Sequence, residues 1–237
     1  MKPGILFIVA TPIGNLSDMT FRAIETLKSV DFVVCEDTRV TQKLLKHYSI
    51  ETKTMSYHQH STGQKVQEIV ELLEQGKNLA LVSDAGTPGI SDPGNLLIGE
   101  IYERKKFEVQ VIPIPGASAI ISALSVSGFP TDKFLFLGFP PHKKKRQKFF
   151  QTVADSSYTV GFYESSHRIA KALESLGAFL EPDREMCVCR EISKAFESVY
   201  RGNIQKILDQ KIPEKGEFVI IIKGKEKHSF ERESSQE

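Results

Sequence analysis

Cysteine is scarce in this 237-residue sequence, which contains only Cys35, Cys187 and Cys189. An odd number without regular spacing excludes the disulfide framework of a small secreted protein. The sequence has no C-x-x-C pair and no Cys/His quartet, so we predict no metal site. Cys187 and Cys189 lie two residues apart and would share one face of a strand, where we expect small buried groups.

Long hydrophobic runs are also missing. The apolar stretch at residues 5–10 is too short for a signal peptide followed by a cleavage site. No stretch approaches the roughly 20 apolar residues that span a bilayer. We therefore expect a soluble, cytoplasmic protein with no membrane partner.

Excess charge of one sign is absent, because 31 Lys and Arg residues face 30 Asp and Glu residues, for a formal net charge of +1. This balance excludes a protein that binds a polyanion with its whole surface, so nucleic-acid contact would need a local patch. The one dense basic run is Lys143, Lys144, Lys145 and Arg146, followed by Lys148. Such a run is most often a solvated helix face, and the alternative is contact with RNA phosphates.

Two common phosphate-binding motifs are lacking. No G-x-G-x-x-G follows the first apolar run, and G-x-x-x-x-G-K-[ST] occurs nowhere. Their absence argues against a Rossmann dinucleotide site and against a P-loop.

What the sequence does contain is a regular alternation of short apolar, β-branched runs with helical patterns. It predicts strands at 5–10, 31–36, 79–83 and 109–114, with helices at 20–29, near 66–73 and near 97–101. Phe21, Ile24 and Leu27 would share one side of the first helix, and Gly76 would end the second. Continuous apolar strands separated by helices indicate a parallel sheet covered on both faces.

The second half repeats this style less regularly. We expect strands at 134–138, 159–163, 186–190, 198–201 and 218–223, and the close spacing of the last three predicts hairpins in a mixed sheet. The fold class is therefore α/β, with an N-terminal α/β domain over 1–114 and a C-terminal α/β domain over 115–224. Residues 225–237 form a polar tail that we expect to be disordered.

Three loops rich in glycine, proline and small residues follow strands of the first sheet, at 11–15, 83–94 and 115–119. Ligands of open parallel sheets bind beyond the carboxyl ends of the strands, where such loops let backbone groups approach closely. Each loop alone is explained by a tight turn. The loop at 83–94 is harder to explain in this way, because it is long and carries two carboxylates, and together the three predict a site for an extended polar small molecule.

For other polar groups the sequence allows both a functional and a structural interpretation. Glu36, Asp37 and Arg39 either orient a ligand or form a local ion pair beside a helix start, and the ion pair is the simpler reading. Residues 57–60 read Tyr-His-Gln-His and place two imidazoles on one strand face. Zinc would need a third ligand nearby, so hydrogen bonding is the better interpretation.

Tyr163 and Arg168 follow a later strand, and we give two readings equal weight. Tyr163 would stack on a base and Arg168 would hold a phosphate. Alternatively, Tyr163 lies in the core, Ser165 or Ser166 caps a helix, and Arg168 lies on the surface of that helix.

At these loops the sequence resembles the tetrapyrrole methylase superfamily and, within it, the bacterial 16S ribosomal RNA (cytidine-2′-O)-methyltransferase family. The matching segments run in order from about Ala10 to Glu197: ATPIGNLSDMTFRAIETL, CEDTR, SYHQH, SDAGTPGISDPG, IPGASA, LGFPPHKKKR, FYESSHR and CREISKAFE. One such motif would be weak evidence, whereas eight in register cover nearly the whole folded chain.

The resemblance implies two α/β domains, S-adenosyl-L-methionine in a cleft between them, and a homodimer. It assigns the cofactor-binding residues Pro12, Ile13, Gly14, Asp84, Ala85, Gly86, Thr87, Ser118, Ala119 and Leu137. The acceptor that it implies is a cytidine ribose of 16S ribosomal RNA, within the 30S subunit.

Methylation of a ribose hydroxyl calls for a general base or for a group that stabilises the developing alkoxide. The residues to test are Glu36, Asp37, Glu164, His167 and Lys194. RNA would be held by Arg39, Lys143, Lys144, Lys145, Arg146, Tyr163 and Arg168.

Two departures from the family pattern bear on the acceptor. Ser165-Ser166 stands where members often have Ala-Pro, and no counterpart follows the last strand for the small C-terminal helical domain of longer members. Two alternatives therefore stand beside the RNA methyltransferase. One is a methyltransferase for tetrapyrroles or other small molecules, and the other is a non-catalytic RNA-binding assembly factor with the same fold.

Overall fold

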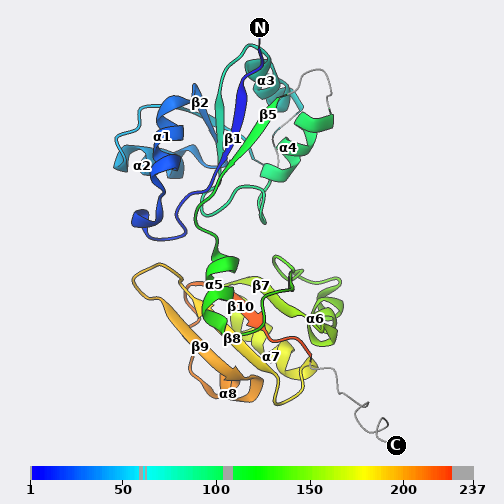
Figure 1. The fold of residues 1–237 in the computed structure, drawn as a ribbon. Coiled ribbons are helices and arrows are strands. Elements are labelled where there is room, and N and C mark those ends of the chain that lie inside the picture. Colours follow the sequence, from blue (N-terminus) through cyan, green and yellow to red (C-terminus); the bar gives the residue numbers. More distant parts are fainter. Residues whose placement is uncertain (1, 59–60, 62, 104–108, 226–237) are drawn as a thin grey trace, which may run out of the picture. The chain divides into compact units, whose positions relative to one another are not determined.

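The computed structural model describes residues 2–58, 61, 63–103 and 109–225. The chain forms two compact units that divide after Ala119 (Figure 1). The boundary predicted from the sequence lies after residue 114, where the last strand of the first sheet ends. Residues 115–119 stay with the first unit because Gly116 packs against Ala10 and the carbonyl of Ala117 accepts a hydrogen bond from Thr87.

The N-terminal unit contains a parallel sheet with strand order β3-β2-β4-β1-β5. Its strands are β1 (Ile5–Val9), β2 (Phe32–Cys35), β3 (Lys53–Ser56), β4 (Leu79–Val82) and β5 (Gln110–Ile114). The four predicted strands are confirmed. Strand β3 was not predicted from the sequence, because its residues KTMS lie at the sheet edge and none is fully buried.

Helices cover both faces of this sheet, as predicted (Figure 1). One face carries α1 (Phe21–Ser29) and α2 (Thr38–His47), and the other carries α3 (Gly63–Glu74) and α4 (Gly94–Glu103). Right-handed crossovers account for this arrangement, since the chain moves outward to β3 and then returns past β1 to β5.

Local signals set the helix ends. Thr20 caps α1 by accepting a hydrogen bond from the amide of Ala23, and Gly76 adopts φ +83° after α3. Of the three apolar side chains predicted on one side of α1, Leu27 is buried, whereas Phe21 is 87% exposed. Ala23 and Leu27 supply the buried side of α1 instead.

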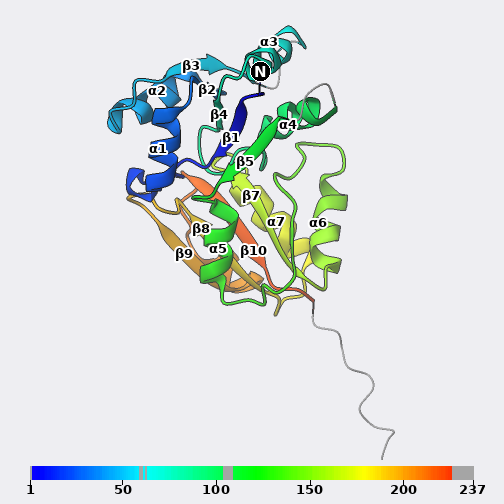
Figure 2. The ribbon, with the colours of Figure 1, turned by 45° about the horizontal axis from the view of Figure 1, so that its top comes forward.

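The C-terminal unit contains a mixed sheet with strand order β6-β7-β10-β8-β9. Its strands are β6 (Phe134–Phe136), β7 (Thr159–Ser165), β8 (Glu185–Arg190), β9 (Ser198–Asn203) and β10 (Glu217–Ile222). β8 and β9 form the expected antiparallel hairpin. The second expected hairpin is wrong, since β10 pairs with β7 and β8 and runs between them (Figure 2).

The helices of this unit also divide between two faces. α6 (Arg146–Asp155), α7 (Ile169–Phe179) and α8 (Ile204–Asp209) enclose the larger core. α5 (Ala119–Ser127) packs Ile120 against Gly161 of β7, where a β-carbon would come within 2.3 Å of the isoleucine. Gly161 therefore permits α5 to approach the sheet closely.

The cysteine prediction is confirmed. Cys35, Cys187 and Cys189 are free and buried, and the sulfur atoms of Cys187 and Cys189 lie 3.7 Å apart on one face of β8. Among the described residues no group of His, Cys, Asp or Glu side chains is arranged to hold a metal ion. In the same part of the chain, no helix has the length and apolar character needed to cross a membrane.

Candidate active site

The three loops singled out in the sequence converge at one edge of the N-terminal sheet. They follow β4, β1 and β5, which are adjacent strands in that order and run in the same direction. Thr11, two residues after the end of β1, forms an isolated β-bridge with Gly86 in the loop after β4. The Thr11 amide donates to the Gly86 carbonyl at 2.9 Å, and the Gly86 amide donates back at 3.1 Å.

The third loop joins this pair. The hydroxyl of Thr87 donates to the carbonyl of Ala117 at 3.2 Å. A β-carbon on Gly86 would lie 3.4 Å from a methyl group of Ile13, and one on Gly116 would lie 2.9 Å from the β-carbon of Ala10. The absence of side chains at these glycines therefore lets the three backbones approach closely.

Hydrogen bonds hold the long loop at 83–94 in place. One oxygen of Asp92 accepts from the amide of Gly89 at 2.8 Å and from the amide of Gly94 at 2.7 Å. The hydroxyl of Ser83 donates to the carbonyl of Gly86 at 3.2 Å. Asp84 and Ala85 remain exposed at the beginning of this ordered loop.

The remaining expected cofactor residues lie in different surroundings. Pro12 is buried, Ile13 is half-buried and Gly14 is exposed, while Ser118 and Ala119 are half-buried at the end of the third loop. Leu137 belongs to the C-terminal unit and packs against its main core. Its contact with a cofactor stays a prediction.

Glu36 extends the same sheet edge, because it follows β2, the neighbour of β4. Burial, followed by the negative charges of Asp84 and Asp92, raises the pKa of Glu36 above its ordinary value, while His58 acts in the opposite direction. A carboxylate with a raised pKa is a better proton acceptor near neutral pH. Glu36 thus has the electrostatic surroundings of a general base.

Asp37 is held in a local structure. Its carboxylate accepts from the Arg39 amide at 2.8 Å, which makes it the N-cap of α2, and it pairs with the Arg39 guanidinium at 2.7 Å. The hydrogen bond from Arg39 lowers the pKa of Asp37 to about 2. The local ion pair beside a helix start is confirmed, and so low a pKa makes Asp37 a poor general base.

His58 is not on a strand, because β3 ends at Ser56. His58 lies in a turn, where its amide donates to the hydroxyl of Ser61 and its carbonyl accepts from the Ser61 amide. His60 lies outside the described residues.

In the C-terminal unit, Glu164 is buried between two arginines. Its carboxylate lies 2.9 Å from Nε of Arg168 and 3.8 Å from Nη1 of Arg146, and its side chain has 0% exposure. This burial leaves Glu164 without access to a substrate hydroxyl, so the structure argues against a role as general base. Arg146 and Arg168, expected on phosphates, are turned inward to the same carboxylate.

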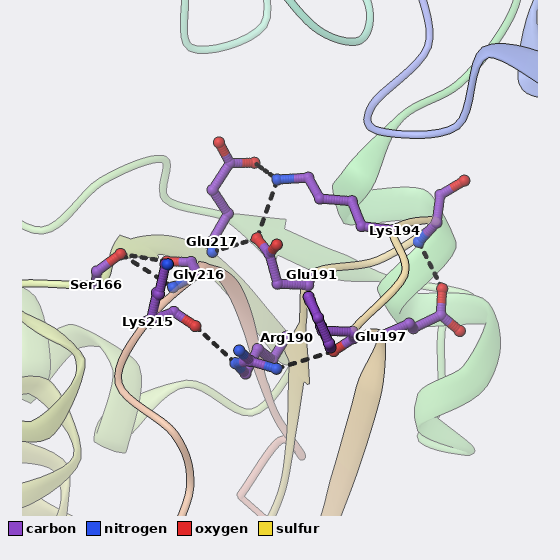
Figure 3. Close-up of polar contacts among 10 residues, drawn as sticks. Ser166, Arg190, Glu191, Lys194, Glu197, Lys215, Gly216 and Glu217 are labelled. Atoms are coloured by element: carbon purple, nitrogen blue, oxygen red, sulfur yellow. Dashed lines mark hydrogen bonds and ion pairs between the residues drawn. The ribbon is translucent and has the colours of Figure 1, made fainter.

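Lys194 lies in the segment between β8 and β9, and its ammonium group bridges two carboxylates. Its ammonium lies 3.0 Å from Glu191 and 3.0 Å from Glu217 (Figure 3). Burial acts against the charge on Lys194, but the hydrogen bonds to Glu191 and Glu217 outweigh burial, so its pKa is raised. Lys194 is thus a fixed cation that can stabilise negative charge but cannot accept a proton near neutral pH.

The segment FYESSHR is tied to that same network. The hydroxyl of Ser166 donates to the Gly216 carbonyl at 2.7 Å and accepts from the Gly216 amide at 3.1 Å (Figure 3). The reading of Ser165 or Ser166 as a helix cap is wrong, because Arg168 occupies the N-cap position of α7. His167 is exposed.

Tyr163 is half-buried and packs edge-on against Phe136 and Phe139. Its hydroxyl accepts from the amide of Ile120 at 3.2 Å, in the first turn of α5. These contacts favour the structural reading of Tyr163 over stacking on a base. The lysines at 143–145, in contrast, are exposed.

Several residues of these networks were not singled out from the sequence. Thr11, Asp92, Glu191 and Glu217 act through hydrogen bonds to distant or backbone partners, which spacing does not reveal. Asp92 had one signal, since it stands two residues before Gly94 in a loop with several glycines. Such carboxylates often accept from backbone amides in turns.

Comparison with known proteins agrees with this architecture. The family profile described as tetrapyrrole (corrin/porphyrin) methylases matches residues 6–208. A curated protein of Synechocystis sp. named ribosomal RNA small subunit methyltransferase I is 46% identical, over 98% of this chain and 84% of that protein. A Bacillus subtilis protein of the same name is 42% identical, over 97% of this chain and 78% of that protein.

Solved structures of low sequence identity share the fold. The methyltransferase CobJ has a TM-score of 0.67 at 18% identity, over 93% of this chain and 94% of that chain. Cobalt precorrin-4 methyltransferase has a TM-score of 0.65 at 15% identity, over 92% and 94% of the two chains. By the match of its sequence and by its fold, the chain belongs to the tetrapyrrole methylase family.

Proposed function

We propose that this protein transfers a methyl group from S-adenosyl-L-methionine to the 2′-hydroxyl of a cytidine in 16S ribosomal RNA. The curated relatives, at 42–46% identity over most of the chain, are named as methyltransferases of small-subunit ribosomal RNA. The observation that carries the donor site is the convergence of the loops after β4, β1 and β5, tied together through Thr11, Gly86 and Ala117.

The donor matches this edge in chemistry. S-adenosyl-L-methionine supplies an electrophilic methyl group next to a positive sulfonium when it is bound. Glycines at 86 and 116 keep the backbone open to a ligand, and Asp84 offers an exposed carboxylate to positive charge. We assign donor binding to Pro12, Ile13, Gly14, Asp84, Ala85, Gly86, Thr87, Ser118, Ala119 and Leu137.

For proton transfer, Glu36 is the candidate that the geometry supports best. Its raised pKa suits it to accept the proton of the ribose hydroxyl, and it follows a strand adjacent to β4. The raised pKa of Lys194 suits this residue to stabilise the developing alkoxide instead. Orientation of the hydroxyl in line with the methyl group would supply most of the remaining rate.

We propose that the exposed lysines at 143–145 bind the RNA, since three adjacent ammonium groups suit a phosphate backbone. We further propose that the protein works as a homodimer in the cytoplasm, where it meets 30S subunits.

The test is methylation of purified 30S subunits with labelled S-adenosyl-L-methionine, followed by mapping of the modified nucleotide. We expect label in one cytidine 2′-O-methyl group. Label in a base, or label in a porphyrinoid and none in 30S subunits, would refute the proposal. Calorimetric titration with the donor separates out the non-catalytic alternative, in which RNA binds and the donor does not.

A further inference from the structure

Glu164 occupies an unusual position for a carboxylate. It lies near the end of β7 with no exposed side-chain surface. One of its oxygens accepts from the Ser165 amide at 2.9 Å and forms an ion pair with Nε of Arg168, also at 2.9 Å. Arg146 approaches its other oxygen at 3.8 Å. One buried negative charge therefore holds two guanidinium groups, and neither arginine would keep its inward position easily without it.

Both guanidiniums also donate hydrogen bonds to the backbone that precedes the basic run. Nη1 of Arg168 donates to the carbonyl of Pro140 at 3.2 Å, and Nη1 of Arg146 donates to the carbonyl of Pro141 at 3.4 Å. Prolines have no amide hydrogen, so this segment cannot be fixed by its own backbone donors at these two positions. The arginine side chains fix it through its carbonyls instead.

The basic run that follows is held in a conformation that needs such support. Lys145 adopts φ +67°, a left-handed conformation that is unfavourable for residues with a side chain. It stands at the N-cap of α6 without a side-chain hydrogen bond to that helix. The next residue, Arg146, places its guanidinium 5.0 Å from the centre of the Phe150 ring, which anchors the start of α6 in the core.

We propose that Glu164 is a positioning residue for the RNA substrate. Through Arg146 and Arg168 it fixes the segment from Pro140 to Lys145, so that the exposed lysines are presented together to the RNA backbone. Loss of the Glu164 charge leaves the lysine charges intact but lets the segment become mobile. The free energy needed to order the segment then weakens RNA binding. This inference rests on the proposed function.

The primary test is Glu164→Gln, which keeps the size of the side chain and removes its charge. With purified 30S subunits as substrate, we expect KM to rise about tenfold, since ordering a loop and its side chains commonly costs on that scale. We expect kcat and the calorimetric Kd for S-adenosyl-L-methionine to change less than about twofold. A fall in kcat with unchanged KM would overturn the inference and restore Glu164 as a general base.

A double-mutant cycle separates positioning from general destabilisation. In the triple variant Lys143→Ser, Lys144→Ser, Lys145→Ser, the added change Glu164→Gln has no lysines left to position, so KM for 30S subunits should show no further rise. An equal rise in both backgrounds would overturn the inference. Glu164→Asp retains the charge and should restore part of the RNA affinity.

Arg168→Lys covers the case in which Glu164→Gln does not fold. A lysine keeps the positive charge but cannot contact Glu164 and the Pro140 carbonyl with the geometry of a guanidinium, so the same rise in KM is expected. An unchanged KM in this variant would overturn this inference but leave the proposed function intact. Wild-type protein that leaves 30S subunits unmethylated would instead refute the proposed function.

Discussion

Thr11 and Gly86 exchange a pair of backbone hydrogen bonds, at 2.9 and 3.1 Å, across two loops that are far apart in the sequence. Gly86 adopts φ +83° at this bridge, a conformation in which a β-carbon is strained. The bridge couples the backbone conformation of the loop after β4 to that of the loop after β1. Changes at Gly86 should therefore reach the donor site directly.

Gly86→Ala is expected to cost about 1–2 kcal/mol of stability, the usual penalty of a left-handed alanine. The Kd for S-adenosyl-L-methionine, measured by calorimetry, should rise as the two loops separate. Gly99→Ala is the matched control, because it lies within α4 and a β-carbon there meets nothing within 4 Å. The control should keep donor affinity and gain a little stability. Equal donor affinity in both variants would contradict the assignment of the Gly86 loop to the donor site.

Asp84→Asn should weaken binding of the cationic donor more than binding of its uncharged product. The exposed carboxylate of Asp84 favours positive charge near the end of β4, and the sulfonium charge is lost when the methyl group leaves. We expect about a tenfold rise in the donor Kd, equivalent to about 1.4 kcal/mol. Calorimetry with S-adenosyl-L-methionine and S-adenosylhomocysteine measures both. Asp132→Asn, at an exposed position of the C-terminal unit, serves as the control.

Glu36→Gln should lower kcat by about 10²–10⁴, the contribution typical of a positioned general base. In the wild type, burial and the charges of Asp84 and Asp92 raise the pKa of Glu36, so activity should increase with pH through that raised value. The variant should lack this ascending limb. In Asp84→Asn one repelling charge is gone, so the limb should move to lower pH. An ascending limb that persists in Glu36→Gln would contradict the assignment of Glu36 as the base.

Asp37→Ala should lower Tm more than Asp37→Asn, because asparagine can still cap α2 and alanine cannot. The hydrogen bond from Arg39 lowers the pKa of Asp37 from 3.8 to about 2. A lowered carboxyl pKa stabilises the folded state above the ordinary pKa, and this stabilisation is lost as pH falls toward 2. Thermal unfolding between pH 5 and 2 should therefore show a steeper loss of Tm in the wild type than in Asp37→Asn. Parallel curves would contradict the assignment.

Some features could be read from the sequence because they depend on local composition. The buried strands 5–9, 32–35 and 79–82 are continuous apolar runs, which only a sheet covered on both faces accommodates. Others escaped detection for identifiable reasons. The sequence AIISALSVS of α5 is apolar around most of its circumference and shows no helical period, and α8 has only six residues.

The sequence by itself determined the fold class and the loops rich in small residues, because hydrophobic periodicity and turn composition act within a few residues. Only the tertiary structure decided the insertion of β10 between β7 and β8, and the burial of Glu164 between Arg146 and Arg168. The physical reason is that strand pairing and the environment of a charge depend on contacts between residues far apart in the chain, and residue type and spacing do not encode those contacts visibly.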